Sequence, residues 1–194
     1  MSMDIKLEKI EKSYGEQKVF ENFSYTFREG KTTCIMGMSG CGKTTLFRLL
    51  LGLEKPEKGQ IAGVPYGHLA AVFQENRLCE NLSAVSNLRL TCKRKLTEEE
   101  IREAFAQVGL EEVWQKPVRD LSGGMKRRVA ILRALFAEAE CILMDEPLKG
   151  LDAETKEKTA DYIRAQAKGK TLLVITHDET EIPLLGAEEV LRLP

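Results

Sequence analysis

Apolar and charged residues alternate near the start of the chain. Ile5, Leu7 and Ile10 each lie between charged residues, and residues 23–27 repeat the alternation with three aromatic rings. A repeat of two is typical of a half-buried β-strand and differs from the 3.6-residue repeat of a helix. This part of the chain is therefore expected to form antiparallel β-structure with one apolar face.

Three later segments are largely apolar without alternation, at 33–36, 141–144 and 171–176, and a last short strand is expected over 190–193. Continuous apolar runs of this length are typical of strands buried on both faces of a parallel sheet. Helical patterns separate these strands, including one over 153–168. Strands that alternate with helices predict an α/β fold with a mostly parallel core.

Glycine and proline residues interrupt the pattern over 52–59, and two short strands follow. The first is expected around Ile61 and the second over 70–73, and we expect the two to pair with each other. His68 stands between them and is interpreted as a surface residue in the resulting hairpin.

Residues 75–120 differ from the segments on either side, because helical patterns with polar breaks replace the strands. Thr97 begins one of these helices with a capping box, and Gly109 ends it. A single domain is expected over the whole chain. Its first part would cover 1–74, a helical subdomain would cover 75–120, and the last part would cover 121–194.

The overall charge is balanced, with 29 Lys and Arg residues against 30 Asp and Glu residues. This balance gives no support to nucleic-acid binding, for which a basic surface is typical. The five cysteines form no C-x-x-C pair, as expected for reduced thiols in the cytosol. No apolar run approaches the roughly 20 residues of a membrane-spanning helix. We therefore expect a soluble protein that is able to dock on a membrane protein.

Residues 37–44 read G-x-x-x-x-G-K-T, the pattern of a phosphate-binding P-loop. The apolar segment before it and the helical pattern after it supply the strand–loop–helix context that the motif requires. Lys43 is expected to reach the β- and γ-phosphates, and the Thr44 hydroxyl to bind Mg²⁺. The alternative, a chance glycine-rich turn, is disfavoured by this context. Nucleotide contacts are expected at Gly37, Met38, Ser39, Gly40, Cys41, Gly42, Lys43, Thr44 and Thr45.

Two acidic residues, Asp145 and Glu146, follow the apolar strand at 141–144. Ligands of open α/β sheets bind at this carboxyl edge, so both side chains are expected near the phosphates. Asp145 is predicted to hold Mg²⁺, and Glu146 to orient and activate a water molecule. Such a pair is often only part of a loop, but a P-loop in the same sheet favours catalysis.

A second anion site is predicted where Ser122, Gly123 and Gly124 precede an amphipathic helix. A serine hydroxyl, bare glycine N–H groups and the positive end of the helix dipole together attract phosphate. The alternative is an ordinary helix cap, in which the serine only satisfies its own helix. Two phosphate-binding loops in one chain suggest that both serve one nucleotide from different protomers.

The order of these motifs resembles that of the ABC (ATP-binding cassette) ATPases, from about Ile5 to the end of the chain. The resemblance implies a P-loop NTPase (RecA-like) core, an N-terminal antiparallel β-subdomain and an inserted α-helical subdomain. It also implies that Tyr14 stacks on adenine, that Gln74 contacts Mg²⁺ and the attacking water, and that His177 contacts the γ-phosphate. Asp152 matches the end of the D-loop, which touches a partner protomer, and is equally suited to cap its own helix.

Three features depart from the usual pattern of that family. Met125 stands where a glutamine is usual, so that side-chain contribution is lost, while the contacts of Ser122 should survive. The D-loop reads L-K-G-L-D over 148–152 where an S-A-L-D pattern is commoner, so the segment that signals between the two sites is altered. The stretch between the P-loop helix and Gln74 is short, which implies a reduced antiparallel β-subdomain.

The resemblance implies an ATPase that uses ATP and Mg²⁺ and forms a homodimer in the ATP-bound state. Its expected partners are a separate integral membrane permease and a solute-binding protein, and its expected place is cytoplasmic, peripheral on the inner face of the cell membrane. Residues 74–88 look like those of nitrate, sulfonate and taurine importers. The alternative is a soluble ABC ATPase that moves no solute, such as a cofactor-assembly cassette. A small kinase or GTPase is disfavoured, because Ser122 to Gly124 are present and an N-K-x-D guanine motif is absent.

Overall fold

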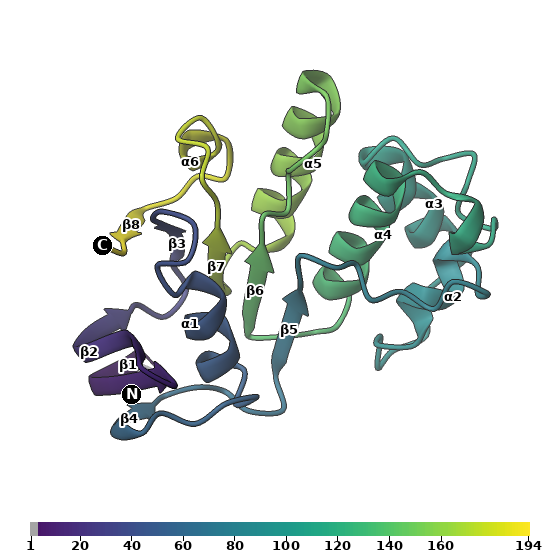
Figure 1. The fold of residues 1–194 in the computed structure, drawn as a ribbon. Coiled ribbons are helices and arrows are strands. Elements are labelled where there is room, and N and C mark those ends of the chain that lie inside the picture. Colours follow the sequence, from purple (N-terminus) through teal and green to yellow (C-terminus); the bar gives the residue numbers. More distant parts are fainter. Residues whose placement is uncertain (1–3) are drawn as a thin grey trace.

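The computed structural model describes residues 4–194, which form two β-sheets and a set of helices (Figure 1). Five strands form a parallel sheet in the order β5-β6-β7-β3-β8, and three form an antiparallel sheet in the order β2-β1-β4. The strands are β1 (Ile5–Tyr14), β2 (Gln17–Phe27), β3 (Thr32–Met36), β4 (Lys58–Ala62), β5 (Leu69–Val72), β6 (Cys141–Asp145), β7 (Thr171–Ile175) and β8 (Glu189–Arg192). The helices are α1 (Lys43–Leu50), α2 (Ala84–Arg89), α3 (Glu98–Gln107), the 3₁₀ turn η1 (Val118–Asp120), α4 (Gly123–Leu135), α5 (Ala153–Gln166) and α6 (Glu181–Leu184). The predicted α/β class with a mostly parallel core is confirmed.

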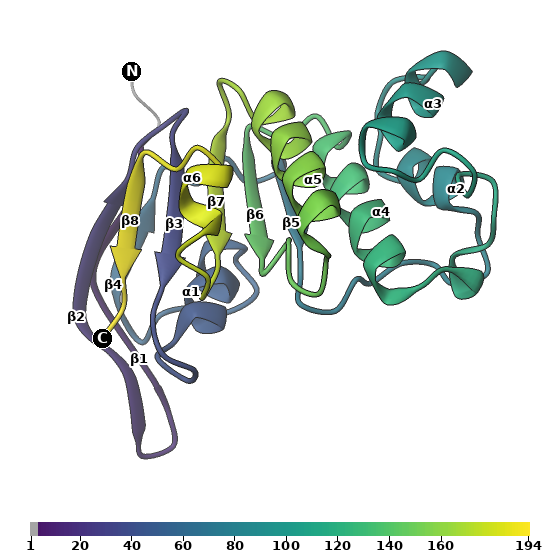
Figure 2. The same ribbon diagram turned by 90° about the horizontal axis from the view of Figure 1, so that it is seen from above.

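The parallel sheet is buried on both faces, as its apolar strands predict. In β6, Cys141 and Leu143 pack into an apolar cluster with α1 and β1, whereas Ile142 and Met144 pack into a second cluster with α4 and α5. Alternate side chains of a strand point to opposite faces, so one continuous apolar run contributes to both cores. Figure 2 shows the strands of this sheet side by side. Their aligned carboxyl ends form the edge at which ligands of such sheets bind.

The antiparallel sheet contains a bulge in β1, at the point where the spacing of its apolar residues changes from two to three. Ile5 and Leu7 are buried two residues apart, whereas Ile10 follows after three. The pairing register between β1 and β2 shifts within this interval, where Lys9 has a left-handed φ of 49°. Such a bulge adds one residue and turns the strand, so Ile10 returns to the buried face. The prediction of half-buried antiparallel strands is confirmed.

The predicted hairpin between the two short strands is wrong. β4 pairs with β1 in the antiparallel sheet, whereas β5 pairs with β6 at the edge of the parallel sheet. The reason is burial, because β5 alternates buried with half-buried residues beside the core, while most of β4 is exposed. His68 is exposed, as predicted, but it lies in the segment that carries the chain from one sheet to the other.

Helices α2, α3 and α4 lie together at one end of the molecule, beyond β5 (Figure 1). The predicted capping box of α3 is formed: the Glu100 N–H donates to the Thr97 hydroxyl at 3.2 Å, and the Thr97 N–H donates to the Glu100 carboxylate at 2.8 Å. Gly109 follows α3 with a φ of 66°, as expected for a residue that ends a helix. Within residues 4–194, no helix combines the length and the apolar character needed to cross a bilayer.

Candidate nucleotide-binding site

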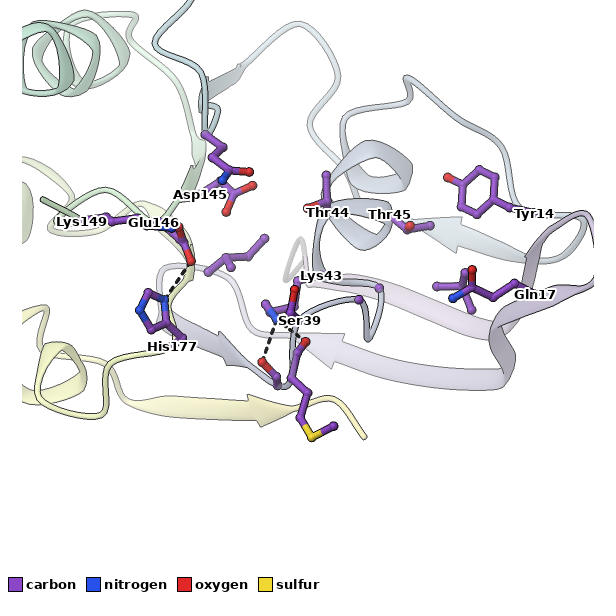
Figure 3. Close-up of a pocket in the computed structure, with 17 residues that line it drawn as sticks. Tyr14, Gln17, Ser39, Lys43, Thr44, Thr45, Asp145, Glu146, Lys149 and His177 are labelled. Carbon is purple, nitrogen blue, oxygen red and sulfur yellow. Dashed lines mark hydrogen bonds and ion pairs between the residues drawn. The ribbon is translucent and has the colours of Figure 1, made fainter. Parts of the chain in front are cut away.

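A cavity of about 740 Å³ lies at the carboxyl edge of the parallel sheet (Figure 3). It gathers side chains from the ends of β6 and β7, from the loop after β3 and from β1. Predicted site residues that line it are Tyr14, Gly37, Met38, Ser39, Gly40, Gly42, Lys43, Thr44, Thr45, Gln74, Asp145, Glu146 and His177. Predicted site residues outside its lining are Cys41, Ser122, Gly123, Gly124 and Asp152.

Glycine shapes the predicted P-loop, which connects β3 to α1. Gly42 has a φ of 100° just before α1, and a Cβ atom there would lie 2.6 Å from a methyl carbon of Val19. Both the conformation and the space therefore require glycine. Lys43 donates hydrogen bonds to the carbonyl oxygens of Gly37 and Met38, each at 2.7 Å, which hold its ammonium group against the loop. No side chain caps α1, so its first N–H groups suit a bound phosphate.

Asp145 ends β6 and is largely buried at the cavity. Burial raises the pKa of its carboxyl group, and the neighbouring charge of Glu146 adds to the rise, while Arg127, Lys43 and Lys149 oppose it. A carboxylate kept out of water in this way gains strongly from a nearby cation. Its position is the one that the sequence predicts for a magnesium ligand.

Both carboxylate oxygens of Glu146 have partners (Figure 3). Oε1 lies 2.8 Å from Nδ1 of His177, and Oε2 lies 2.5 Å from Nζ of Lys149. Burial by itself would raise the pKa of Glu146, but hydrogen bonds and charges from Lys149 and His177 lower it below its usual value. Glu146 is therefore ionised at neutral pH, as a group that accepts a proton from water must be.

Three residues that line the cavity offer oxygen ligands that fit Mg²⁺. Thr44 offers a hydroxyl group, Gln74 an amide oxygen and Asp145 a carboxylate, and all three residues line the same cavity. These are hard oxygen ligands of the kind that Mg²⁺ prefers. One protein carboxylate is sufficient, because Mg²⁺ in nucleotide sites takes its other ligands from phosphate and water.

Tyr14 lies at the opposite end of the cavity from Glu146 and His177, with the P-loop between them (Figure 3). Tyr14 as a whole residue is 44% exposed, its hydroxyl donates to Glu54 at 2.5 Å, and the Lys12 ammonium lies 5.1 Å from the ring centre. These contacts orient the ring. The exposed part of its surface is available for stacking with a planar group.

The Ser122 segment lies outside the cavity, at the start of α4. The Ser122 hydroxyl accepts a hydrogen bond from a backbone N–H of α4 at 3.3 Å, so it caps its own helix. Gly124 is close to the D-loop, since a Cβ atom there would lie 3.3 Å from a methyl carbon of Leu151. Asp152 caps α5 in the same way, by accepting from a backbone N–H at 3.0 Å. The two segments that were predicted to serve a partner protomer are therefore neighbours.

Lys149 and Gln17 also line the cavity, although neither was predicted as a site residue. Lys149 follows Glu146 by three residues, and opposite charges at that spacing were a signal for the ion pair. Gln17 begins β2, on the far side of the turn after Tyr14, and no pattern in the sequence marks it.

An open parallel sheet with a P-loop and acidic residues at its carboxyl edge defines a P-loop nucleotide-binding protein. The model of the ABC transporter family matches residues 20–149. The chain belongs to this family, which confirms the resemblance drawn from its motifs.

Two similar proteins are named as ATP-binding proteins of import. The chain is 35% identical over 193 residues to the Fe(3+) ions import ATP-binding protein FbpC of Escherichia coli (strain K12), a match over 91% of this chain and 56% of that protein. It is 37% identical over 194 residues to the spermidine/putrescine import ATP-binding protein PotA of Pasteurella multocida (strain Pm70), over 91% of this chain and 52% of that protein. The chain thus spans about half the length of these curated relatives.

Solved structures agree with the fold. The dimeric post-hydrolysis state of the ATP-binding cassette MJ0796 bound to ADP and Pi matches with a TM-score of 0.82 and 29% identity, over 97% of this chain and 94% of that one. A bacterial Atm1-family ABC exporter with ATP bound matches with a TM-score of 0.87 over 98% of this chain and 37% of that one. Its 22% identity supports the shared fold alone.

Proposed function

We propose that this protein is the ATP-binding and ATP-hydrolysing subunit of an ABC transporter. The observation that carries the proposal is the one cavity that joins Lys43, the acidic pair Asp145 and Glu146, and the exposed ring of Tyr14. A phosphate-binding loop between an aromatic ring and two carboxylates suits a nucleoside triphosphate. The similar cassette solved with ADP and Pi supports a nucleotide of this kind.

Binding in this proposal begins at the P-loop. Lys43 exchanges its hydrogen bonds to the loop carbonyls for phosphate oxygens, and the uncapped N–H groups of α1 bind further oxygens. Thr44, Gln74 and Asp145 are the residues that would hold Mg²⁺, which neutralises charge on the β- and γ-phosphates when bound. Tyr14 stacks on the base at the far end of the cavity.

Glu146 is the proposed base for the attacking water. A positioned base of this type contributes about 10²–10⁴-fold to a rate. His177 holds one oxygen of the carboxylate, and Lys149 holds the other. The Lys149 side chain is 55% exposed, so it can swing away and free an oxygen without disturbing the core.

The proposed active form is a homodimer with ATP at the interface. Ser122, Gly123 and Gly124 of one protomer complete the site around Lys43 of the other, and Asp152 lies at the same interface. Two observations support this arrangement. The Ser122 segment lies outside the cavity of its own chain, and the similar cassette MJ0796 was solved as a dimer.

The proposed task is to energise an integral membrane permease that is a separate chain. The protein would act as a peripheral subunit on the cytoplasmic face of the membrane, with the helical part at 75–120 as the docking region and a solute-binding protein as a further partner. Similarity to proteins named for import supports this role.

The most specific part of the proposal is the identity of the transported solute. The pattern over 74–88 favours a small solute of the nitrate, sulfonate or taurine type. The similar proteins named above act in import of Fe(3+) ions and of spermidine and putrescine. A small imported solute is common to both, and the permease and solute-binding protein would select it.

The substitution Glu146→Gln tests the ATPase part of the proposal. It keeps the size and the hydrogen-bonding ability of the side chain but removes the base, so turnover should fall by about 10²–10⁴-fold. ATP binding should persist, and an ATP-bound dimer should accumulate. Phosphate release and light scattering measure these two results. Hydrolysis at the wild-type rate would show that the base lies elsewhere.

Co-purification from membranes tests the transporter part. The tagged chain should recover a polytopic membrane protein, and its ATPase rate in vesicles should rise when the solute is supplied. Recovery of a soluble assembly partner in place of a permease would instead favour the cofactor-assembly alternative.

A further inference from the structure

Arg127 is a buried arginine on α4, only 6% exposed. One terminal nitrogen of its guanidinium donates to the carbonyl oxygen of Phe73 at 2.5 Å and to the side-chain oxygen of Asn76 at 3.3 Å. The other donates to the carbonyl oxygen of Asp145 and to that of Glu146, the latter at 2.7 Å. One side chain therefore binds two separate segments of the cavity wall.

These segments carry the predicted reactive residues. Phe73 and Asn76 lie on either side of Gln74, whose own carbonyl oxygen is 3.5 Å from the same guanidinium nitrogen. The backbone pairing between β5 and β6 ends at Val72 and Met144. Arg127 binds the carbonyl oxygens of the next residue in each strand direction, Phe73 and Asp145. Arg127 thus extends the connection between the two strands into the site, at the point where the sheet stops.

The chemistry of the guanidinium suits this bridging position. It is planar and its donors point in fixed directions, so it sets the spacing of the carbonyl oxygens that it binds. All of the acceptors named above are backbone or amide oxygens, and hydrogen bonds from a charged donor to such groups are stronger than neutral ones. Without the cation, these oxygens would lose partners in a largely buried place.

Arg127 also belongs to the helix that Ser122 caps. In the proposed dimer, the Ser122 end of α4 faces the nucleotide of the partner, whereas Gln74 and Glu146 act on the nucleotide of their own chain. Arg127 therefore links a segment that serves one ATP to both of the segments that serve the other, the one around Gln74 and the one after β6.

We propose that Arg127 is a positioning residue that couples the two halves of the ATP site, because it joins the Ser122 helix to the Gln74 and Glu146 segments of the same protomer. This inference rests on the proposed function. ATP that settles on Lys43 and Gln74 sets the orientation of α4 through Arg127, and so prepares Ser122 for the ATP of the partner. Coupling of this kind is reciprocal, so closure of the dimer also adjusts Gln74 and Glu146.

The test compares Arg127→Gln with the control Arg133→Gln, both in a Glu146→Gln background. Arg133 lies on the same helix and also binds backbone oxygens, those of Asn76 and Arg77 at 3.2 and 2.8 Å. Within residues 4–194, its guanidinium forms no hydrogen bond or ion pair with the segment after β6. Arg133→Gln therefore controls for the loss of an arginine that joins α4 to a loop. The readouts are affinity for a fluorescent ATP analogue at low protein concentration and the ATP concentration that gives half-maximal dimerisation.

Arg127→Gln should change the ATP affinity of the isolated protomer no more than Arg133→Gln does. It should raise the ATP concentration for dimerisation about tenfold above that of this control, which is a typical size for coupling between sites. Arg127→Lys keeps the charge but presents a single nitrogen, so it should show the same defect. With the native Glu146 restored, both Arg127 variants should also lower kcat and reduce the Hill coefficient toward one.

Several results would overturn the proposal. Dimerisation of Arg127→Gln at the ATP concentration of the Arg133→Gln control would remove the coupling role. Full rescue by Arg127→Lys would show that charge matters and bridging does not. Failure of the Glu146→Gln variant with native Arg127 and Arg133 to bind ATP or to dimerise would instead overturn the proposed function, and this inference with it.

Discussion

The P-loop and the segment at 122–124 both place glycine at the start of a helix, and they differ in whether a side chain already caps that helix. The P-loop leads into α1, which has no capping side chain, and Gly42 before it has a φ of 100°. Residues 122–124 form the start of α4, with Ser122 as its cap and Gly123 and Gly124 in its first turn. The P-loop borders the cavity and the Ser122 segment does not.

Similar chemical groups form a complete phosphate site at the P-loop but only half of one at residues 122–124. Both segments offer glycine N–H groups, a hydroxyl group and the positive end of a helix. The P-loop adds a lysine and a concave wall. The Ser122 segment satisfies its own helix and lies beside the D-loop, so it needs a second surface to become a phosphate site. Four tests distinguish the two segments, and they are given in order of decreasing expected effect.

Replacing Ser122 by alanine should have the largest effect. Loss of one hydrogen bond that acts at the reacting phosphate should lower turnover by about 10²–10³-fold, with little change in the ATP affinity of the isolated protomer. Ser83→Ala is the matched control, because Ser83 caps α2 in the same way. Both changes should lower stability by about 0.5–2 kcal/mol in thermal unfolding, but only Ser122→Ala should impair hydrolysis. Equal turnover in the two variants would contradict the half-site role.

Lys43→Ala should give the opposite result, with loss of binding. Each charge-assisted hydrogen bond contributes about 1.5–3 kcal/mol. The free energy of ATP binding should therefore become less favourable by that amount, even in the isolated protomer. Titration calorimetry measures it. An unchanged affinity would remove Lys43 from the phosphate site.

A pair of glycine substitutions tests the backbone difference. Gly42→Ala forces a side chain into the left-handed region and against Val19, so it should lower stability by about 1–3 kcal/mol and impair ATP binding. Gly123→Ala meets open space at a helical position, so the fold should keep its stability. Chemical denaturation compares the two variants. Equal losses would show that glycine is not specifically required at Gly42.

Met125→Gln should have the smallest effect. Met125 is partly buried against the α4 core, and glutamine restores the side chain that is usual in this family. ATPase activity should stay intact or rise. A large loss of turnover at unchanged stability would give Met125 a role that its apolar contacts do not explain.

Local patterns predicted much of the fold and of the candidate site. The P-loop, the capping box at Thr97 and the buried strand before Asp145 depend on residues within a few positions of one another, so the sequence reveals them directly. The pairing of β4 and β5 was predicted wrongly, because two short strands close in sequence are natural partners until burial is known. Lys149 was missed because its significance depends on the cavity that it lines.

The sequence by itself determined the kind of chemistry, through the spacing of Gly37 to Thr44 and the acids after a buried strand. Only the tertiary structure decided that Lys43, Glu146 and His177 share one cavity while Ser122 stays outside it. It also decided that the buried charge of Arg127 joins two strand ends. The physical reason is the separation along the sequence of the residues that interact. Turns, helix caps and strands depend on residues that are neighbours along the chain. The pairing of strands and the hydrogen bonds of a buried charge such as that of Arg127 depend on residues that are far apart in sequence.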